Sequence, residues 1–300
     1  MAEQPPSPAR ASRAVPARPA LLAGLALLTG LTLFVALGPL LHQPPGLTVT
    51  EQVRQRNLPP GWSHPLGTDD LGRDLMLRMM LGGRISLAVG LVATAISVGL
   101  GTGVGLVAGY FRRLDGWLMR LTDLFLALPL LPLLLVAAML WREPLALRFG
   151  AESGSFLLIT GAIGLTGWMQ VARIVHAEVL SLREREYLAA ARSIGAGPGR
   201  LILRHILPNV LPSVLVAATI GVSGAILTES ALSFLGLGFP PDYPTWGRLL
   251  SEGVEHMETQ PLRVLWPGLA LTLTVLAATW IGDGLHLALD PRRRALKPRP

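Results

Sequence analysis

The chain has 300 residues, of which 51% are hydrophobic and 15% charged, and its formal net charge is +7. The hydrophobic residues form long uninterrupted blocks, a composition typical of membrane proteins. The chain contains no cysteine, which excludes disulfides, thiolate catalysis and cysteine-ligated metals. Because basic residues flank the apolar blocks, membrane topology explains the positive charge better than nucleic-acid binding does.

The predicted elements begin with a tail at residues 1–19, which is rich in proline and alanine and is expected to be disordered. Residues 20–41 follow without any charge, and they exceed the roughly 20 residues that a helix needs to cross a membrane. A cleaved signal peptide would have a shorter apolar region and a small-residue cleavage site, which residues 34–46 offer only poorly. We therefore predict an uncleaved first transmembrane helix, which together with an external segment occupies residues 20–84.

Five further apolar spans fall within the predicted transmembrane core at residues 85–290. They cover residues 85–110, 121–140, 156–175, 206–231 and 264–288. Six spans in total predict an all-α membrane protein. With the N-terminus in the cytoplasm, the inner segments, including a basic tail at residues 291–300, hold 17 of the 26 lysine and arginine residues. The positive-inside rule therefore predicts a multi-pass membrane protein with both termini in the cytoplasm.

Small residues and prolines indicate how these spans pack and bend. Gly101, Gly105 and Gly109 recur at four-residue spacing in the second span and reduce one helix face to backbone, which favours close helix contact in lipid. Prolines interrupt the third and fifth spans at Pro129, Pro132, Pro208 and Pro212. Because proline removes a backbone donor, a bend is expected in each of these two helices. Ordinary packing of a helix bundle is sufficient to account for both patterns.

The sequence contains no motif for ATP hydrolysis. Lys297 is the only lysine in the chain, so the phosphate-binding pattern G-x-x-x-x-G-K-[ST] is absent and the chain does not hydrolyse ATP through a P-loop. A secondary transporter would carry ionisable residues in the middle of its spans. Those present lie near span ends, at Asp123, Glu229, Asp283 and His286. Structural pairing, with Arg120 as a candidate partner for Asp123, is therefore favoured over ion coupling.

The segment HPLGTDDLGRD at residues 64–74 supplies an imidazole and three carboxylates, which raises the question of a metal site. It lacks the i, i+4 histidine pair of a zinc helix and the spaced acidic residues of a calcium loop. A turn rich in glycine and proline that leads into an interfacial helix is the favoured interpretation. We predict no metal site, cofactor site or catalytic residue in this chain.

An arginine- and alanine-rich segment at about residues 183–200 separates the fourth and fifth spans, on the cytoplasmic side of the predicted topology. At 100° per residue, one helix stripe carries Tyr187, Leu188, Ala191, Ile194 and Gly195. The opposite stripe carries Arg185, Glu186, Ala189, Arg192 and Ser193. Gly195 and Pro198 are expected to end this short amphipathic helix. Two functions stay open: a surface helix that ties two spans together, or a docking helix whose three consecutive alanines admit a partner groove.

The patch Ala189, Ala190 and Ala191, followed by Gly195 and then by Leu207-Pro208, resembles the EAA loop of permease subunits in binding-protein-dependent ABC importers. Within that family, the chain is most similar to the C-type permeases of dipeptide, oligopeptide and nickel importers. The matching stretches follow the family's order at residues 64–74, 82–91, 108–123, 184–210, 229–253 and 267–292. The resemblance implies a type I importer permease of the bacterial plasma (inner) membrane, with six transmembrane helices and a cytoplasmic coupling helix.

The resemblance also implies partners and a function. A homologous B-type permease would complete the translocation pathway, two cytoplasmic ATP-binding subunits would bind ATP and Mg²⁺, and an external solute-binding protein would deliver substrate. Membrane lipid is a further expected partner, and nucleic acid is not. The chain would import dipeptides or oligopeptides, with nickel or another small solute as the alternative. A secondary transporter and an assembly scaffold are the rival functions from other classes.

The coupling helix implied by the resemblance includes seven residues. They are Glu186, Tyr187, Ala189, Ala190, Ala191, Arg192 and Gly195. Ala189 stands where the family usually has glutamate, so a charged contact with the ATPase is either missing or supplied by Glu184 or Glu186. Near the end of the chain the usual GDGLRD reads GDGLHL, with His286 and Leu287, so family details of the inner end of the sixth span do not carry over.

Overall fold

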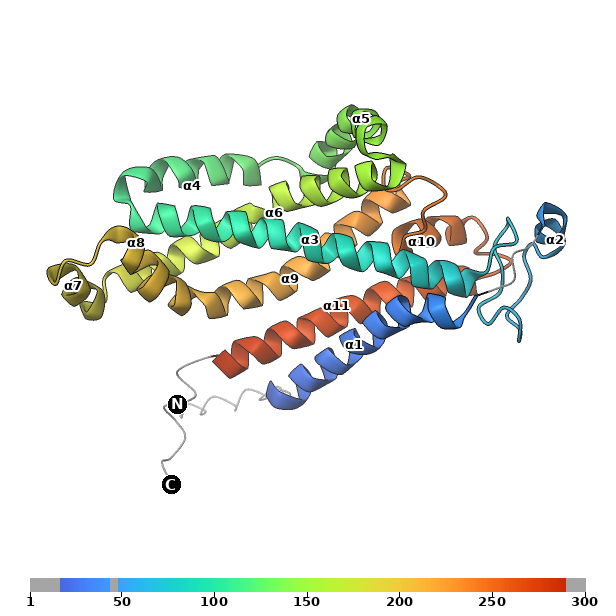
Figure 1. The fold of residues 1–300 in the computed structure, drawn as a ribbon, viewed down its shortest axis with the longest axis horizontal. Coiled ribbons are helices and arrows are strands. Elements are labelled where there is room, and N and C mark those ends of the chain that lie inside the picture. The colour runs from blue at the N-terminus through green and yellow to red at the C-terminus, as the bar shows by residue number, and fades with distance from the viewer. Residues whose placement is uncertain (1–16, 44–47, 290–300) are drawn as a thin grey trace, which may run out of the picture.

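The computed structural model describes residues 17–43 and 48–289, and the regular secondary structure of these residues is helical (Figure 1). The elements in chain order are α1 (Ala17–Leu41), α2 (Val49–Arg54), α3 (Leu75–Tyr110), α4 (Arg112–Leu126), α5 (Leu130–Phe149), α6 (Ala151–Arg183), α7 (Glu186–Ser193), α8 (Pro198–Leu201), the π-helical turn η1 (Ile202–Ile206), α9 (Leu207–Phe234), α10 (Trp246–Val254) and α11 (Leu262–Leu289). The predicted basic tail at residues 291–300, and residues 1–16 of the predicted N-terminal tail, lie outside the described residues.

Six of the described helical segments are long and apolar enough to cross a membrane. They are α1, α3, α5, α6, the continuous run from α8 through η1 to α9, and α11. This number confirms the predicted all-α fold with six spans. The start of α1 and the end of α11 lie at the same end of the bundle as α7, whereas α2 and α10 lie at the opposite end (Figure 1). These two ends are called the α7 end and the α10 end below.

The third predicted span, residues 121–140, is wrong as a single helix, because the chain is broken at residues 127–129 into α4 and α5. Pro129 has no amide hydrogen and disfavours helical backbone at the residue before it, so one helix ends and another begins here. α4 runs alongside α3, whereas α5 is seen nearly end-on in Figure 1 and therefore crosses the bundle axis. Gly150, with a φ of 86°, then reverses the chain from α5 into α6.

The glycine stripe of α3 packs directly against α6, which confirms the predicted close helix contact. A Cβ atom at Gly101 would lie 2.6 Å from Val171 Cβ, and one at Gly105 would lie 2.7 Å from Val175 Cβ. These separations are well inside van der Waals contact, so glycine is required for the two backbones to approach this closely. α3 and α6 form the most extensive helix pair, and α9 packs against both of them.

α1 contains Pro39, and an arginine of α3 compensates for the backbone bond that this proline removes. The carbonyl of Val35 would normally accept a hydrogen bond from the amide of residue 39, which proline lacks. Arg84 donates its Nε to Val35 O at 2.7 Å and its Nη2 to Ala36 O at 2.6 Å. The same arginine therefore supplies hydrogen bonds to two backbone carbonyls of α1 and joins α1 to α3.

The fifth span is irregular next to its first proline. η1 lies directly before Leu207 and Pro208, and the amide of Leu207 donates to the carbonyl of Ile202, five residues back rather than four. The sequence predicts a bend from these prolines, and the structure places a π-helical turn at Ile202–Ile206, next to Pro208. Pro212, by contrast, is accommodated inside α9.

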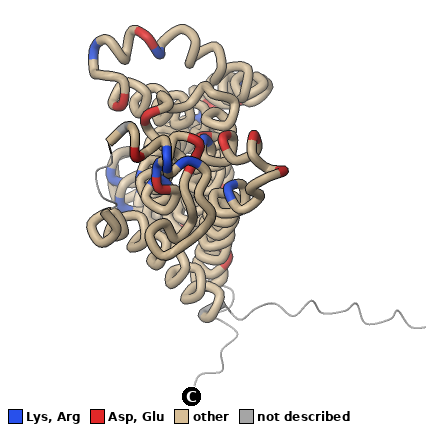
Figure 2. Tube along the Cα trace, turned by 90° about the vertical axis from the view of Figure 1, so that its right-hand side faces the viewer, with Lys and Arg blue, Asp and Glu red and all other residues tan. Residues whose placement is uncertain are grey.

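At the α10 end, residues 48–74 form α2 and a turn-rich segment that leads into α3. Asp74 caps α3 by accepting a hydrogen bond from the amide of Leu77 at 2.8 Å. The same carboxylate contacts His64 Nδ1 at 2.8 Å and His42 Nε2 at 3.1 Å. This geometry confirms the predicted turn, but the helix that follows is the long apolar α3 and not a separate interfacial helix. The contacts of Asp74 tie the end of α1 to the start of α3. Figure 2 looks onto this end of the bundle and shows acidic and basic residues interleaved.

Candidate functional site

α7 projects from the bundle between α6 and α8, and its C-terminus is closed by a regular backbone motif (Figure 1). The amide of Gly195 donates to Arg192 O at 2.9 Å, and the amide of Ala196 donates to Ala191 O at 3.1 Å. Gly195 has a φ of 86°, so these bonds form the Schellman motif that glycine favours. The predicted end of the helix at Gly195 is confirmed.

The predicted apolar stripe of α7 is only partly buried. Leu188 is fully buried and Ala191 nearly so, and both belong to a hydrophobic cluster that includes Val179 of α6. Tyr187 and Ile194 are 44% and 87% exposed. These two residues of the stripe therefore lie outside the contact with the bundle, because a helix of eight residues rests on the bundle along one edge only.

Of the seven predicted coupling residues, the structure exposes all except Ala191. The exposed ones are Glu186, Tyr187, Ala189, Ala190, Arg192 and Gly195. Opposite the buried edge, the short side chains of Ala189 and Ala190 leave the helix backbone accessible. Ala191 is instead part of the contact between α7 and the bundle. α7 thus presents one accessible face of small residues and one buried edge.

The two glutamates near the start of α7 have different surroundings. Glu184 Oε1 lies 3.5 Å from Arg183 Nε and 3.7 Å from Arg112 Nη2, so this carboxylate already contacts two arginines of its own chain. Glu186 lies exposed in the first turn of α7. Of the two candidates for the charge that Ala189 lacks, Glu186 is the one that belongs to α7 itself.

A cavity of about 520 Å³ lies between α3, α6, α9 and the junction of α4 with α5. Its polar lining comprises Thr94, Ser97, Thr166, Gln170 and Thr228. Its apolar lining includes Phe125 and Leu133, which stand on either side of the break between α4 and α5. All the lining residues are uncharged, so this wall can offer hydrogen bonds to a solute without selecting it by charge.

The sequence predictions missed this cavity, although a signal for it is present. Thr94 and Ser97 in the second span, and Thr166 and Gln170 in the fourth, are polar residues at helical spacing within apolar sequence. Ser97 Oγ donates to Gly164 O at 3.0 Å, which joins the two helices at the cavity. Among the described residues, Thr94 Oγ1 is buried without a hydrogen-bond partner. The close packing of α3 on α6 is what places both pairs on one wall.

Two of the ionisable residues near the span ends, Asp123 and Glu229, take part in separate contacts. Asp123 Oδ1 lies 3.8 Å from Arg173 Nε, so the prediction of Arg120 as its partner is wrong. The reason is that Arg173 belongs to α6, whose packing against α4 could not be read from the local sequence. Glu229 is fully buried and accepts hydrogen bonds from hydroxyl groups of α3 and α9, including Ser86 Oγ at 2.9 Å. These arrangements agree with structural pairing.

Comparisons with known proteins identify relatives over most of the chain. The chain is 38% identical over 269 residues to a Brucella suis biovar 1 protein that is named as a peptide transport system permease protein, covering 90% of this chain and 86% of the relative. It is 37% identical over 277 residues to the dipeptide transport system permease protein DppC of Alkalihalophilus pseudofirmus, covering 91% and 86%.

A solved structure and a family model agree with these relatives. A chain of the MetNI methionine ABC transporter in an inward-facing conformation matches with a TM-score of 0.58 at 19% identity, covering 71% of this chain and 97% of that one, a likeness that shows the fold alone. A family model described as the binding-protein-dependent transport system inner membrane component matches residues 101–295. The chain therefore belongs to this family, the multi-pass inner-membrane permease subunits of ABC importers.

Proposed function

We propose that this chain is the non-catalytic membrane subunit of an ATP-driven importer for dipeptides or oligopeptides. Its relatives named as peptide and dipeptide permeases support this substrate class. The cavity supports it independently, because an uncharged wall suits solutes whose side chains vary in charge. A wall of hydroxyl, amide and apolar groups lacks the imidazole and carboxylate ligands that bind Ni²⁺ well, so it favours a peptide over nickel.

The observation that carries the coupling role is the accessible face of α7. We propose that this face binds in a groove on a cytoplasmic ATP-binding subunit, with Glu186 supplying the charged contact. The buried edge at Leu188 would transmit movement of α7 to α6 and α9 through the cluster that it shares with them. In this assignment both termini lie in the cytoplasm together with α7.

Partner subunits complete the proposed transporter. Two ATP-binding subunits would bind ATP and Mg²⁺, and a homologous B-type permease would form the other half of the pathway. An external binding protein would deliver substrate at the α10 end, on the side of the bundle away from α7 (Figure 1).

The test uses the complete transporter, reconstituted in lipid vesicles with its ATP-binding subunits and binding protein. We expect ATP-dependent uptake of a labelled dipeptide such as dialanine and no uptake of Ni²⁺. Ala190→Trp places a bulky side chain on the accessible face of α7. Overpacking at an interface costs roughly 1–3 kcal/mol, so dipeptide uptake should fall by about fivefold to a hundredfold.

Ala151→Trp is the matched control, because Ala151 is also exposed but begins α6 at the opposite end of the bundle. Its uptake should stay close to that of the unmodified transporter. Normal uptake by Ala190→Trp would contradict the docking role of α7. Uptake of Ni²⁺ in place of dipeptide would contradict the substrate class and leave the docking role standing.

A further inference from the structure

A basic pocket of about 260 Å³ lies at the base of α7. Its lining residues are Tyr110, Arg112, Arg183, Glu184 and Arg192. They come from the C-terminal ends of α3 and α6, the first turn of α4 and the last turn of α7. Elements that are far apart in the sequence therefore meet around this pocket, whose lining holds three guanidinium groups and one carboxylate.

The carboxylate of Glu184 neutralises this pocket only weakly. Its Oε1 lies 3.7 Å from Arg112 Nη2 and 3.5 Å from Arg183 Nε, beyond the roughly 2.7–2.9 Å of a strong charge-assisted hydrogen bond. Arg183 donates its Nη1 to Gly109 O at 3.1 Å, but its Nε is buried without a hydrogen-bond partner in the described part of the chain. A buried N–H group in this state costs free energy that an incoming acceptor would recover.

Arg192 is held at the pocket by an aromatic ring. Its guanidinium carbon lies 5.7 Å from the centroid of the Tyr110 ring, within the range of a cation–π contact. This contact orients the arginine but supplies no oxygen acceptor for its N–H groups. The pocket therefore combines oriented donors with an excess of two positive charges.

We infer that this pocket binds a phosphate group. Guanidinium groups present a planar fork of donors that matches the oxygens of phosphate, and several of them converge here. The pocket lies where the apolar helices α3 and α6 end, which is the level at which phospholipid headgroups meet a membrane protein. An anionic phospholipid and a free phosphate-bearing solute are two sources of the same group.

A bound phosphate would link α7 to the ends of α3, α4 and α6. Arg192 is the contribution of α7 to this link, and Arg112 and Arg183 are those of α4 and α6. Occupancy would therefore restrain α7 relative to the bundle, whichever partner α7 binds. The inference does not depend on the proposed coupling role.

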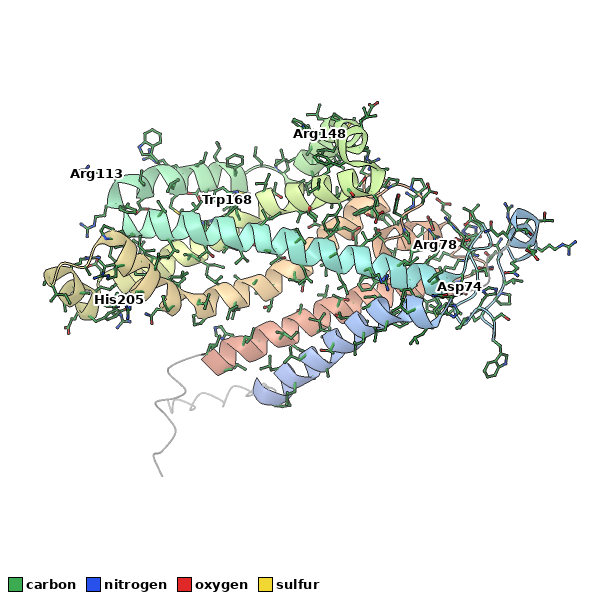
Figure 3. All side chains as sticks on the ribbon, in the orientation of Figure 1. Asp74, Arg78, Arg113, Arg148, Trp168 and His205 are labelled. Atoms are coloured by element: carbon green, nitrogen blue, oxygen red, sulfur yellow. The ribbon has the colours of Figure 1, made fainter. Side chains whose placement is uncertain are left out.

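The test measures phosphatidylglycerol binding to the assembled transporter by native mass spectrometry in detergent. Arg112→Gln and Arg192→Gln should each lower the bound fraction about fivefold, the effect of removing one arginine near an anionic headgroup. Arg113→Gln is the matched control, since it removes the same charge from the neighbouring residue, which lies at the same end of the bundle but does not line the pocket (Figure 3). Arg112 is largely exposed, so its replacement should leave the melting temperature unchanged.

Inorganic phosphate, titrated in a second arm, distinguishes the two sources. Lipid that stays bound against phosphate identifies the headgroup, and phosphate that binds alone or displaces the lipid identifies a free solute; both results support the site. Equal losses in Arg112→Gln and Arg113→Gln would show a general effect of surface charge and overturn the inference. Release of the ATP-binding subunits from Arg112→Gln, with lipid and phosphate binding unchanged, would assign the pocket to an acidic protein partner and also overturn it.

Discussion

At the scale of single residues, Arg78 shows how one buried charge holds distant segments together. Its Nη1 lies 2.9 Å from Asp69 Oδ2 and 2.5 Å from Glu252 Oε2, and its side chain is only 6% exposed. Burial opposes ionisation of Glu252, but the hydrogen bonds and charges of Arg78 and Arg248 outweigh it and hold the pKa of this carboxyl below its usual value. The start of α3, the turn segment before it and α10 are therefore joined by ionic contacts.

Glu252→Gln is expected to lower the free energy of unfolding by about 2 kcal/mol near neutral pH, because Arg78 loses a charged hydrogen-bond partner. The folded pKa lies below the ordinary value of 4.5. The carboxylate therefore stabilises the fold fully above that pH, and its contribution is lost as the pH falls through the folded pKa. Thermal unfolding in detergent at neutral pH and at about pH 3 should show a difference that shrinks in acid.

Glu255→Gln is the control for this measurement, since Glu255 is an exposed carboxylate at the end of the same helix. It should have little effect at either pH. A destabilisation by Glu252→Gln that stays the same in acid would contradict the assigned ion pairing.

At the scale of elements, the α3–α6 contact shows that one residue type has opposite roles on two faces of a helix. A Cβ atom at Gly105 would lie 2.7 Å from both Ala172 O and Val175 Cβ, and the backbone carbonyl cannot move without displacing α6. A Cβ atom at Gly103 would have no described atom within 4 Å. The spacing of the glycines predicts the packed face, and the structure identifies Gly103 as lying outside it.

Gly105→Ala is therefore expected to destabilise the protein by roughly 1–3 kcal/mol, the cost of overpacking a close contact. Gly103→Ala should be neutral or stabilise the helix by about 0.5–1 kcal/mol, because alanine favours helix more than glycine does. Melting temperatures of the two variants in the same detergent provide the measurement. Equal stability of the two variants would contradict the packed face.

At the scale of the whole molecule, the cavity and α7 are connected through one packed core. Val171 lines the cavity and also belongs to the hydrophobic cluster that holds Leu188 and Ala191 of α7. The non-helical residues 127–129 lie beside the same cavity, between its lining residues Leu126 and Leu130. Interrupted helices within a membrane are tolerated where they line a polar cavity, which agrees with a solute pathway at this position.

Gln170→Glu would place a negative charge in this cavity. If the cavity is part of the pathway, uptake of an acidic dipeptide should fall about tenfold relative to that of a basic dipeptide, because the new charge repels one and attracts the other. The measurement is the ratio of alanyl-glutamate to alanyl-lysine uptake in reconstituted vesicles. Gln170→Leu removes the amide without adding charge and should leave this ratio unchanged. An unaltered ratio in Gln170→Glu would place the pathway elsewhere.

The features that the sequence determined by itself are those that depend on neighbouring residues along one helix. Five of the six apolar spans, the glycine face of α3, the turn at residues 64–74 before α3 and the end of α7 at Gly195 all follow from local composition and spacing. The absence of a P-loop lysine is likewise a property of the sequence alone. Each of these predictions needed only the periodicity of a helix or the conformational preference of one residue.

Only the tertiary structure decided which side chains from different helices meet. The break at Pro129 could be predicted as a bend, but the packing of α5 across the bundle could not. Arg173 replaces Arg120 as the partner of Asp123, and Arg183 reaches the base of α7, because α6 packs against α4 and returns to the α7 end. The uncharged cavity and the basic pocket arise in the same way, since their walls come from residues that are distant in sequence and are brought together only by helix packing.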